Sequence, residues 1–343
     1  MLTPTLTRPA VADLDDALQR RQFLAVLAAA GLLTACGTDD EPTSEGAQPW
    51  SFTDDRGSVI NRPGRPVKIA AYETAGAALY YLGLKPAAIF SSGDMAKSKL
   101  LEGVDLTGIE SVGGKAYGEI QLEKLAKIAP DIIVTAYSPK QGDPVWGFAD
   151  KTVQDKVAAI APVIALDGTK DPTAVIARFE ELAKALGADL AAAPVSDAKK
   201  TFDGAVEELK SAAAAKKDLR VLAIGGYSEK LYVAKPSEFP ALRQMKSWGL
   251  NLIEPTGKDP LWETLSFEHA DKYPADLILV DTKDDAMTTE QLAKIPTWKR
   301  LPAVQAGQLV RWQAIEDWSY TRYTDDITVI TQALQKANRT TAA

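Results

Sequence analysis

The stretch that decides the fold class runs from Val67 to Ser91 and reads VKIAAYETAGAALYYLGLKPAAIFS. Val67 to Ala71 is a short run typical of a β-strand. Ala75 to Leu82 is helical in composition, with Gly83 as its stop, and Ala87 to Ser91 is again typical of a strand. This succession predicts a strand, a helix and a second strand, as in α/β proteins.

The same pattern returns further along the chain. Helices predicted over Leu122–Ile128 and Val153–Ile160 lead into apolar strands at Asp131–Val134 and Val163–Leu166. Unbroken apolar strands that alternate with helices are typical of a sheet covered on both faces. Two short strands about a turn at Asp54–Gly57 precede the unit. We therefore expect a first α/β lobe over residues 51–187.

A second set of apolar and helical segments follows residue 217. Between the two sets, Asp189 to Lys217 is rich in helix formers and has no strand pattern. Because proline is tolerated in the first turn of a helix, we expect a lobe-connecting helix within 188–217 that begins at or after Pro194. The second lobe then spans 218–343, with segments at Leu219–Ile224, Phe239–Trp248, Leu277–Val280, Thr289–Ile295, Gln308–Trp312 and a final helix over about Thr324–Ala337.

The two sets also share a weak internal sequence repeat. Glu123 precedes the strand-opening Asp131 by eight residues, and Glu268 precedes Asp276 by eight. Both pairs fall at equivalent points of the two predicted lobes. Two similar lobes that face each other predict a ligand cleft between them.

Composition excludes several classes of function. The 343 residues carry a formal net charge of −7, which argues against a nucleic-acid partner. A single cysteine and a single histidine exclude a disulfide framework and a usual His/Cys metal cluster. We therefore expect no cofactor, and any bound metal should arrive inside a ligand. We also expect a monomer.

The N-terminal segment has the order of an export signal. Arg20 and Arg21 precede an uncharged apolar run from Phe23 to Leu33, which is too short to span a membrane. Leu33-Thr34-Ala35-Cys36 resembles the bacterial lipobox, which implies a signal peptide over 1–35 and lipidation of Cys36; a buried cysteine in a helix is the alternative. The arginine pair resembles the twin-arginine export motif, although Gln19 replaces the usual Ser or Thr, so the general secretory route stays open. Residues 36–50 are then a flexible tether.

From about Phe52 to the C-terminus, the chain resembles the solute receptors of ABC transporters for siderophores, haem and cobalamin. The resemblance rests on the order of several segments: Arg65–Ala70, Ala77–Pro86, Val112-Gly113-Gly114, the two glutamate segments, and Trp318-Ser319-Tyr320. It implies two Rossmann-like α/β lobes that are joined by a single long helix, with the ligand cleft between them.

The resemblance also implies partners and a location. Such a receptor lies on the extracytoplasmic face of the cell membrane and delivers its ligand to ABC permease subunits that work with a cytoplasmic ATPase. By position, Glu123 and Glu268 match the glutamates that dock on the permease. The alternative is that each is a solvated carboxylate early in a surface helix.

Ligand residues follow from the same matching positions, at loops beyond the strand ends. Aromatic side chains suit a bulky chelate because they offer rigid surface and a polar edge. The candidates are Tyr72, Lys115, Tyr117, Tyr137, Tyr227, Trp262, Arg311, Trp312, Trp318 and Tyr320, with Trp146 and Arg322 as weaker ones. Core packing is the alternative for each aromatic, most of all for Trp312, which ends an apolar strand.

Charge separates the ligand classes. Anionic catecholates and carboxylate siderophores need several basic residues, and only Lys115 and Arg311 fall at plausible positions, which favours a ferric hydroxamate. His269 lies beside Glu268 on the expected docking face, which disfavours haem ligation, and a receptor for haem or cobalamin remains the alternative ligand assignment.

Two other classes of function compete with a receptor. The chain lacks a G-x-S-x-G elbow, a phosphate-binding G-x-x-x-x-G-K-[ST] loop and a G-x-G-x-x-G fingerprint, so we do not expect an enzyme. A surface scaffold lipoprotein would have a cleft lined by small polar residues, and the spacing of aromatic residues argues against it.

Overall fold

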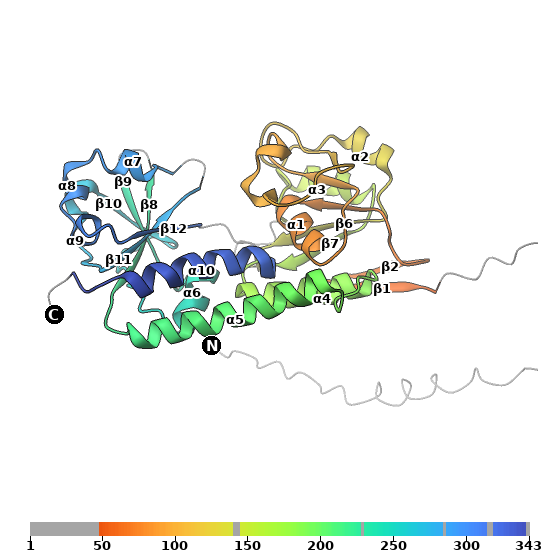
Figure 1. The fold of residues 1–343 in the computed structure, drawn as a ribbon. Helices are drawn as coiled ribbons and strands as arrows, with labels where there is room; N and C mark the ends of the chain where they lie inside the picture. The colour runs from red at the N-terminus through yellow and green to blue at the C-terminus, as the bar shows by residue number, and fades with distance from the viewer. Residues whose placement is uncertain (1–47, 140–144, 228–229, 284–285, 314–317, 341–343) are drawn as a thin grey trace, which may run out of the picture. The chain divides into compact units, whose positions relative to one another are not determined.

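The computed structural model describes residues 48–139, 145–227, 230–283, 286–313 and 318–340. The predicted signal peptide, Cys36 and most of the tether lie outside these ranges. Figure 1 shows two α/β lobes, one near each end of a long helix that runs beneath both. This arrangement confirms the fold class expected from the sequence.

The first lobe has a parallel five-stranded sheet in the order β5–β4–β3–β6–β7. Its central strands are fully buried apolar runs, as a sheet covered on both faces requires. The strands are β3 (Ile69–Tyr72), β4 (Ala88–Phe90), β5 (Glu110–Ser111), β6 (Ile132–Tyr137) and β7 (Val163–Asp167), and the helices are α1 (Glu73–Tyr81), α2 (Leu122–Ile128), α3 (Lys151–Ala158) and α4 (Pro172–Ala185). Two short 3₁₀ turns, η1 (Met95–Lys97) and η2 (Lys99–Leu101), follow β4.

The second lobe has a mixed sheet in the order β10–β9–β8–β11–β12. β11 is parallel to β8 and β12, whereas β9 is antiparallel to β8 and β10. The strands are β8 (Val221–Tyr227), β9 (Lys230–Ala234), β10 (Trp262–Ser266), β11 (Leu277–Asp281) and β12 (Leu309–Trp312). The short helices are α6 (Pro240–Ser247), η4 (Phe267–His269), α7 (Thr289–Leu292), α8 (Pro296–Lys299) and α9 (Pro302–Gln305). The sequence did not predict β9 and β10.

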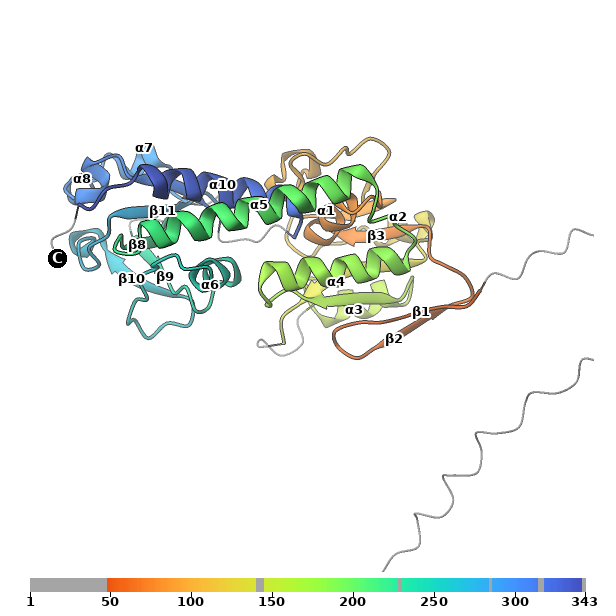
Figure 2. The ribbon, with the colours of Figure 1, turned by 60° about the horizontal axis from the view of Figure 1, so that its bottom comes forward.

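Two helices lie side by side along the junction of the lobes (Figure 2). The connecting helix α5 (Ala193–Ala215) has Pro194 in its first turn, as predicted. The C-terminal helix α10 (Tyr320–Lys336) begins four residues before the expected Thr324. Phe202 of α5 packs against Tyr320 and Tyr323 of α10, with ring centroids 5.2 and 5.7 Å apart. The long helix is therefore braced by a second one.

Polar contacts join the lobes at a further place. Arg243 of α6 forms an ion pair with Asp171, the residue before α4, at 2.7 Å, and donates a second hydrogen bond to the Thr169 carbonyl at 3.0 Å. Gln244 also hydrogen-bonds Thr173. These contacts hold α6 of the second lobe on the N-terminal end of α4 of the first lobe.

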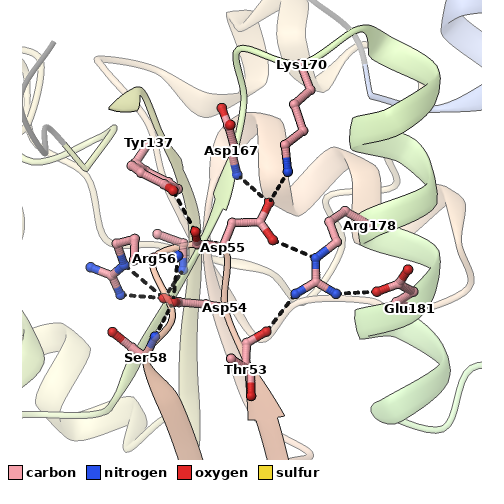
Figure 3. Close-up of polar contacts among 11 residues, drawn as sticks. Thr53, Asp54, Asp55, Arg56, Ser58, Tyr137, Asp167, Lys170, Arg178 and Glu181 are labelled. Atoms are coloured by element: carbon pink, nitrogen blue, oxygen red, sulfur yellow. Dashed lines mark hydrogen bonds and ion pairs between the residues drawn. The ribbon is translucent and has the colours of Figure 1, made fainter. Parts of the chain in front are cut away.

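The hairpin β1 (Trp50–Thr53) and β2 (Val59–Arg62) is fixed to the first lobe by a polar cluster at its turn (Figure 3). The buried Asp54 carboxylate accepts hydrogen bonds from the backbone of Arg56, Ser58 and Ala165. Asp55 forms an ion pair with Arg178 of α4 at 2.6 Å. The folded part of the chain therefore begins with a well-anchored element.

The sequence repeat that contains Asp131 and Asp276 has a structural counterpart in the two lobes. The Asp131 carboxylate accepts a hydrogen bond from the backbone N–H of Lys68, just before β3, at 2.8 Å. The Asp276 carboxylate accepts one from the N–H of Arg220, just before β8, at 2.9 Å. Each aspartate thus ties the start of one central strand to the start of the next, in the same way in both lobes.

Within the described ranges, no helix has the length and apolar character that crossing a membrane requires.

Candidate functional site

A cavity of about 520 Å³ lies between the lobes, at the carboxyl ends of strands of both sheets. Loops that follow strands meet at this edge in α/β proteins and commonly carry the ligand site. From the first lobe, the lining residues follow β3, β4 and β5: Tyr72, Glu73, Ser92, Asp94, Lys97, Ser98, Lys99, Leu100 and Tyr117. From the second lobe they follow β11 and β12: Thr282, Lys283 and Gln313.

Two tyrosines form the aromatic wall of the cavity. The rings of Tyr72 and Tyr117 meet edge to face, with centroids 6.5 Å apart, and Tyr72 also packs on Phe90. The backbone N–H of Gly147 donates to the Tyr117 hydroxyl at 2.9 Å. A Cβ atom at Gly147 would lie 2.4 Å from the Tyr72 ring, and the backbone φ of +81° at this residue also favours glycine. Gly147 therefore fixes the positions of both tyrosines.

Glu73 places a carboxyl group in the same wall. It is the first residue of α1 and only 6% of its surface is exposed. Burial raises the pKa of the Glu73 carboxyl, although hydrogen bonds from Ser98 and Tyr72 favour its ionised form. The Ser98 hydroxyl donates to Glu73 Oε2 at 2.6 Å. Burial beside Glu73 and Tyr117 also raises the pKa of Tyr72.

The segment 92–102 forms a second wall and contacts the other lobe. Lys99 Nζ donates to the carbonyl oxygen of Thr282 at 2.8 Å. The guanidinium of Arg322, near the start of α10, donates to the carbonyl oxygens of Glu102 and Lys99 at 2.8 and 2.9 Å. Both contacts cross between the lobes, so this segment bridges them beside the cavity.

A buried carboxylate shapes the loop of the second lobe that reaches this bridge. Asp281, at the end of β11, accepts hydrogen bonds from the Tyr227 hydroxyl and from the backbone N–H of Lys283. Thr282 lies between Asp281 and Lys283 in the chain, and its carbonyl oxygen accepts a hydrogen bond from Lys99 Nζ. Asp281 therefore holds the turn that presents Thr282 to the first lobe.

The charged groups of the cavity are nearly balanced. Three lysines, Lys97, Lys99 and Lys283, line it together with two carboxyl groups, Glu73 and Asp94. Lys97 lies 3.6 Å from Asp94. Such a lining has no strongly single-signed field, in contrast to sites that bind ligands of high charge.

Of the residues predicted to bind ligand, Tyr72 and Tyr117 line the cavity. Lys115 is exposed and is held through its backbone N–H, which donates to Glu119. The Tyr137 hydroxyl donates to the carbonyl oxygen of Asp55 at 2.8 Å, in the hairpin cluster of Figure 3. The structure thus uses Tyr137 to anchor the hairpin.

Three predicted aromatic residues of the second lobe form one cluster. Trp262 packs on Tyr227 and Trp312, with ring centroids 6.3 and 6.1 Å apart. Trp312 is buried, which agrees with core packing, the alternative stated for it. Trp262 lies on strand β10, paired with Ala234. None of the three is among the described residues that line the cavity.

Trp318 and Tyr320 lie in the junction of the lobes. Trp318 is 3% exposed and stacks on Trp146 and Phe179 of the first lobe. Tyr320 packs on Phe202 of α5. In the described structure both residues, together with Trp146, serve the packing of one lobe on the other and do not face the cavity.

The predicted basic residues also have structural partners. Arg311 forms an ion pair with Asp326 of α10 at 3.2 Å, and Arg322 holds the bridging segment 92–102. The predicted docking residues Glu123 and Glu268 are both exposed, the first in the first turn of α2 and the second in η4. A hydrogen bond with Ser266 holds the pKa of Glu268 below its ordinary value, so this carboxylate is charged at neutral pH.

Sequence reasoning missed most of the cavity lining. Glu73, Lys97, Lys99 and Lys283 are absent from its candidates, although each lies within ten residues of the end of a predicted strand. The turn Ser91-Ser92-Gly93-Asp94 after β4 and the residues after Asp281 were the available signals. The missed residues could be found by treating every loop at the carboxyl ends of the predicted strands as a candidate, whether or not it contains an aromatic residue.

Comparisons with known proteins agree with this architecture. The chain is 31% identical to the ferric-siderophore receptor protein DesE from Streptomyces coelicolor, with a TM-score of 0.77 over 85% of this chain and 100% of that one. It is 24% identical over 300 residues to the Fe(3+)-citrate-binding protein YfmC of Bacillus subtilis (strain 168), which covers 84% of this chain and 85% of that protein. The petrobactin-binding protein YclQ from Bacillus subtilis shares the fold, with a TM-score of 0.63 and 19% identity over 84% of this chain and 99% of that one.

A family model described as periplasmic binding protein matches residues 69–316, a range that begins at β3 and includes β12. The match includes both five-stranded sheets, the connecting helix and every described residue that lines the cavity. The chain therefore belongs to the periplasmic binding protein family.

Proposed function

We propose that this protein is an extracytoplasmic, lipid-anchored receptor that binds a ferric siderophore and delivers it to an ABC permease for iron uptake. The observation that carries the proposal is the cavity between the lobes, at the carboxyl ends of both sheets, with the tyrosine pair in its wall. Membership of the family and the 31% identity to a ferric-siderophore receptor support it. Iron enters only within the bound chelate, and the chain itself acts as a binding protein.

The cavity favours a hydroxamate chelate. A ferric trihydroxamate has a neutral iron centre, an apolar outer surface and a ring of oxygen atoms. The nearly balanced lysines and carboxyl groups suit such a ligand, and Tyr72 and Tyr117 offer rigid surface with a polar edge. A triscatecholate, which carries several negative charges, would need more basic side chains than the three lysines that the described lining provides.

A ferric carboxylate chelate is the second candidate. The basic residues considered from the sequence did not include Lys97, Lys99 and Lys283. These three lysines line the cavity, and their ammonium groups can pair with carboxylate groups of a ligand. The similarity to an Fe(3+)-citrate-binding protein points the same way.

Delivery and anchoring complete the proposal. Exposed Glu123 and Glu268 would pair with basic residues of the permease subunits. The lipid on Cys36, which lies outside the described residues, would hold the receptor at the membrane. Energy for transport would come from the ATPase partner.

The test is a ligand titration of the full chain, purified in detergent and followed by tryptophan fluorescence and by calorimetry. The panel contains a ferric trihydroxamate, a ferric triscatecholate, ferric citrate, haem and cobalamin. We expect saturable binding of the trihydroxamate below about 1 µM. Saturation by ferric citrate alone would select the second candidate, and no response to any of the five would refute the receptor function.

A further inference from the structure

The cavity contains one carboxyl group with an unusual environment. Glu73 is more than nine-tenths buried and lines the cavity directly. Its Oε2 atom accepts a hydrogen bond from Ser98, yet across the described residues Glu73 forms no ion pair. The other carboxyl group of the lining, Asp94, has Lys97 at 3.6 Å and caps η1 by accepting the N–H of Ala96.

Burying a carboxylate without a cationic partner costs free energy, because the group loses its hydration and gains too little in return. The raised pKa of Glu73 has the same origin. Since Glu73 faces the cavity, a ligand can supply the missing charge, and a charged hydrogen bond inside a protein is stronger than a neutral one.

The positions of the lysines strengthen this reasoning. Lys99 Nζ reaches across to the Thr282 carbonyl, and Lys97 is placed beside Asp94. Both ammonium groups therefore have partners other than Glu73. A neutral ferric trihydroxamate would leave the Glu73 carboxylate uncompensated, whereas one with a pendant ammonium group would neutralise it.

We infer that Glu73 is a specificity-determining residue, which selects ferric chelates that carry a primary ammonium group and places that group against the α1 end of the cavity. The inference rests on the proposed function and names the ligand class more closely. Glu73 acts together with Ser98, whose hydroxyl donates to Oε2, and with Tyr72, which also forms a hydrogen bond with the carboxyl group.

The test compares two ferric chelates that differ in one charge. Ferrioxamine B is a ferric trihydroxamate that ends in a primary ammonium group, and its N-acetylated form is neutral. Calorimetric titration of the full chain in detergent should show tighter binding of the ammonium form by about tenfold or more. In Glu73→Gln, which keeps the size of the side chain, this preference should disappear, so that the two chelates bind with equal affinity. Glu207→Gln, on the exposed face of α5, serves as the matched control.

A pH series gives a second measurement that needs no variant. The ammonium preference requires an ionised carboxylate, so it should be full above the raised pKa of Glu73 and decline as the pH falls through it. The other titratable groups that face the cavity are Tyr72 and Tyr117 from the first lobe, Asp94, Lys97 and Lys99 from segment 92–102, and Lys283 from the second lobe. Glu73→Gln should show no such decline, which separates Glu73 from Asp94.

Each outcome decides the inference. Equal binding of the two chelates by the unaltered protein would overturn it and leave the receptor function standing. The same would follow if Glu73→Gln weakened both chelates alike, since Glu73 would then have only a structural role. Failure of the protein to bind either chelate would overturn the hydroxamate assignment and the inference together.

Discussion

The indole ring of Trp318 stacks on that of Trp146, with centroids 5.6 Å apart and 23° between the planes. Trp146 belongs to the first lobe, and Trp318 lies just before the start of α10. The stack therefore packs the N-terminal end of α10, a helix of the second lobe, against the first lobe. Phe179 of α4 packs on Trp318 at 5.7 Å and extends the contact. The junction of the lobes is therefore a hydrophobic core and does not depend on α5 alone.

Replacing Trp318 by alanine should destabilise the protein strongly. Its side chain is almost fully buried, and truncation of a buried tryptophan costs about 3–5 kcal/mol. Urea denaturation followed by circular dichroism measures the change in the free energy of unfolding. Tyr117→Ala is the matched aromatic control: because its side chain is 53% exposed, we expect a loss below about 1 kcal/mol. Similar losses in the two variants would contradict the role of the stack.

Substitutions of Tyr117 and Trp318 should have the reverse order of effect on ligand binding. Tyr117 contributes its ring and hydroxyl to the cavity wall, so Tyr117→Ala should weaken chelate binding by about tenfold. Trp318→Phe, which keeps an aromatic ring in the junction, should change affinity by less than about threefold. Calorimetry with the trihydroxamate measures both. A larger loss in the Trp318 variant would return that residue to the ligand site predicted from the sequence.

The contribution of Asp55 to the stability of the fold should depend on pH. Burial opposes its ionisation, but hydrogen bonds from Arg178 and the backbone of Asp167 hold the pKa of Asp55 below its ordinary value. A carboxyl group whose pKa is lower in the folded protein stabilises the fold above its unfolded pKa of about 4, and this contribution is lost as the pH falls through the folded pKa.

Asp55→Asn should therefore lower the free energy of unfolding at pH 7 by about 1–3 kcal/mol, since it weakens a charged hydrogen bond. The difference from the unaltered protein should shrink towards zero below about pH 4. Urea denaturation at a series of pH values measures it, with Asp155→Asn on the exposed face of α3 as the control. A difference that stays constant with pH would show that charge is not its source.

The sequence predicted the parts of the fold that local patterns control. Apolar runs such as Ile132–Val134 formed central strands, and Pro194 marked the first turn of α5 because proline fits there. Asp131 and Asp276 had equal spacing from a glutamate, and both prove to tie adjacent strands together. These features depend on neighbours in the chain, or on contacts that recur in both lobes.

The rest depended on contacts between distant residues. Trp318 and Tyr320 flank Ser319, whose hydroxyl accepts a hydrogen bond from the Arg322 N–H and caps α10, so both aromatic residues lie at the start of a helix. Strand β9 was missed because Lys230–Ala234 is short and follows β8 after only a brief connection. Lys99 and Lys283 reach the cavity only because the two lobes meet there.

Cys36→Ala should release the protein from the membrane. In the proposed function the Cys36 thiol, in the lipobox-like segment Leu33–Cys36, accepts the lipid, so its removal should remove the acyl chains that hold the protein at the membrane. Cell fractionation with immunoblotting should show the unaltered protein in the membrane fraction and the variant as a soluble or uncleaved form. An unchanged amount of processed protein in the membrane fraction would rule out Cys36 as the anchor. Cys36→Ser distinguishes loss of the thiol from a change of side-chain size.

The docking glutamates offer a test that separates capture from delivery. Glu123 and Glu268 are exposed and do not line the cavity, so Glu123→Ala combined with Glu268→Ala should leave chelate affinity unchanged. Uptake of radioactive iron by cells should nevertheless fall to the level of cells without the receptor, because the double variant lacks both carboxylates that are proposed to contact the permease. Glu207→Ala combined with Glu208→Ala, on the exposed face of α5, is the matched control for removing two surface charges. If the double variant lost affinity in calorimetry, the glutamates would belong to binding; if uptake were normal, the receptor would dock through another surface.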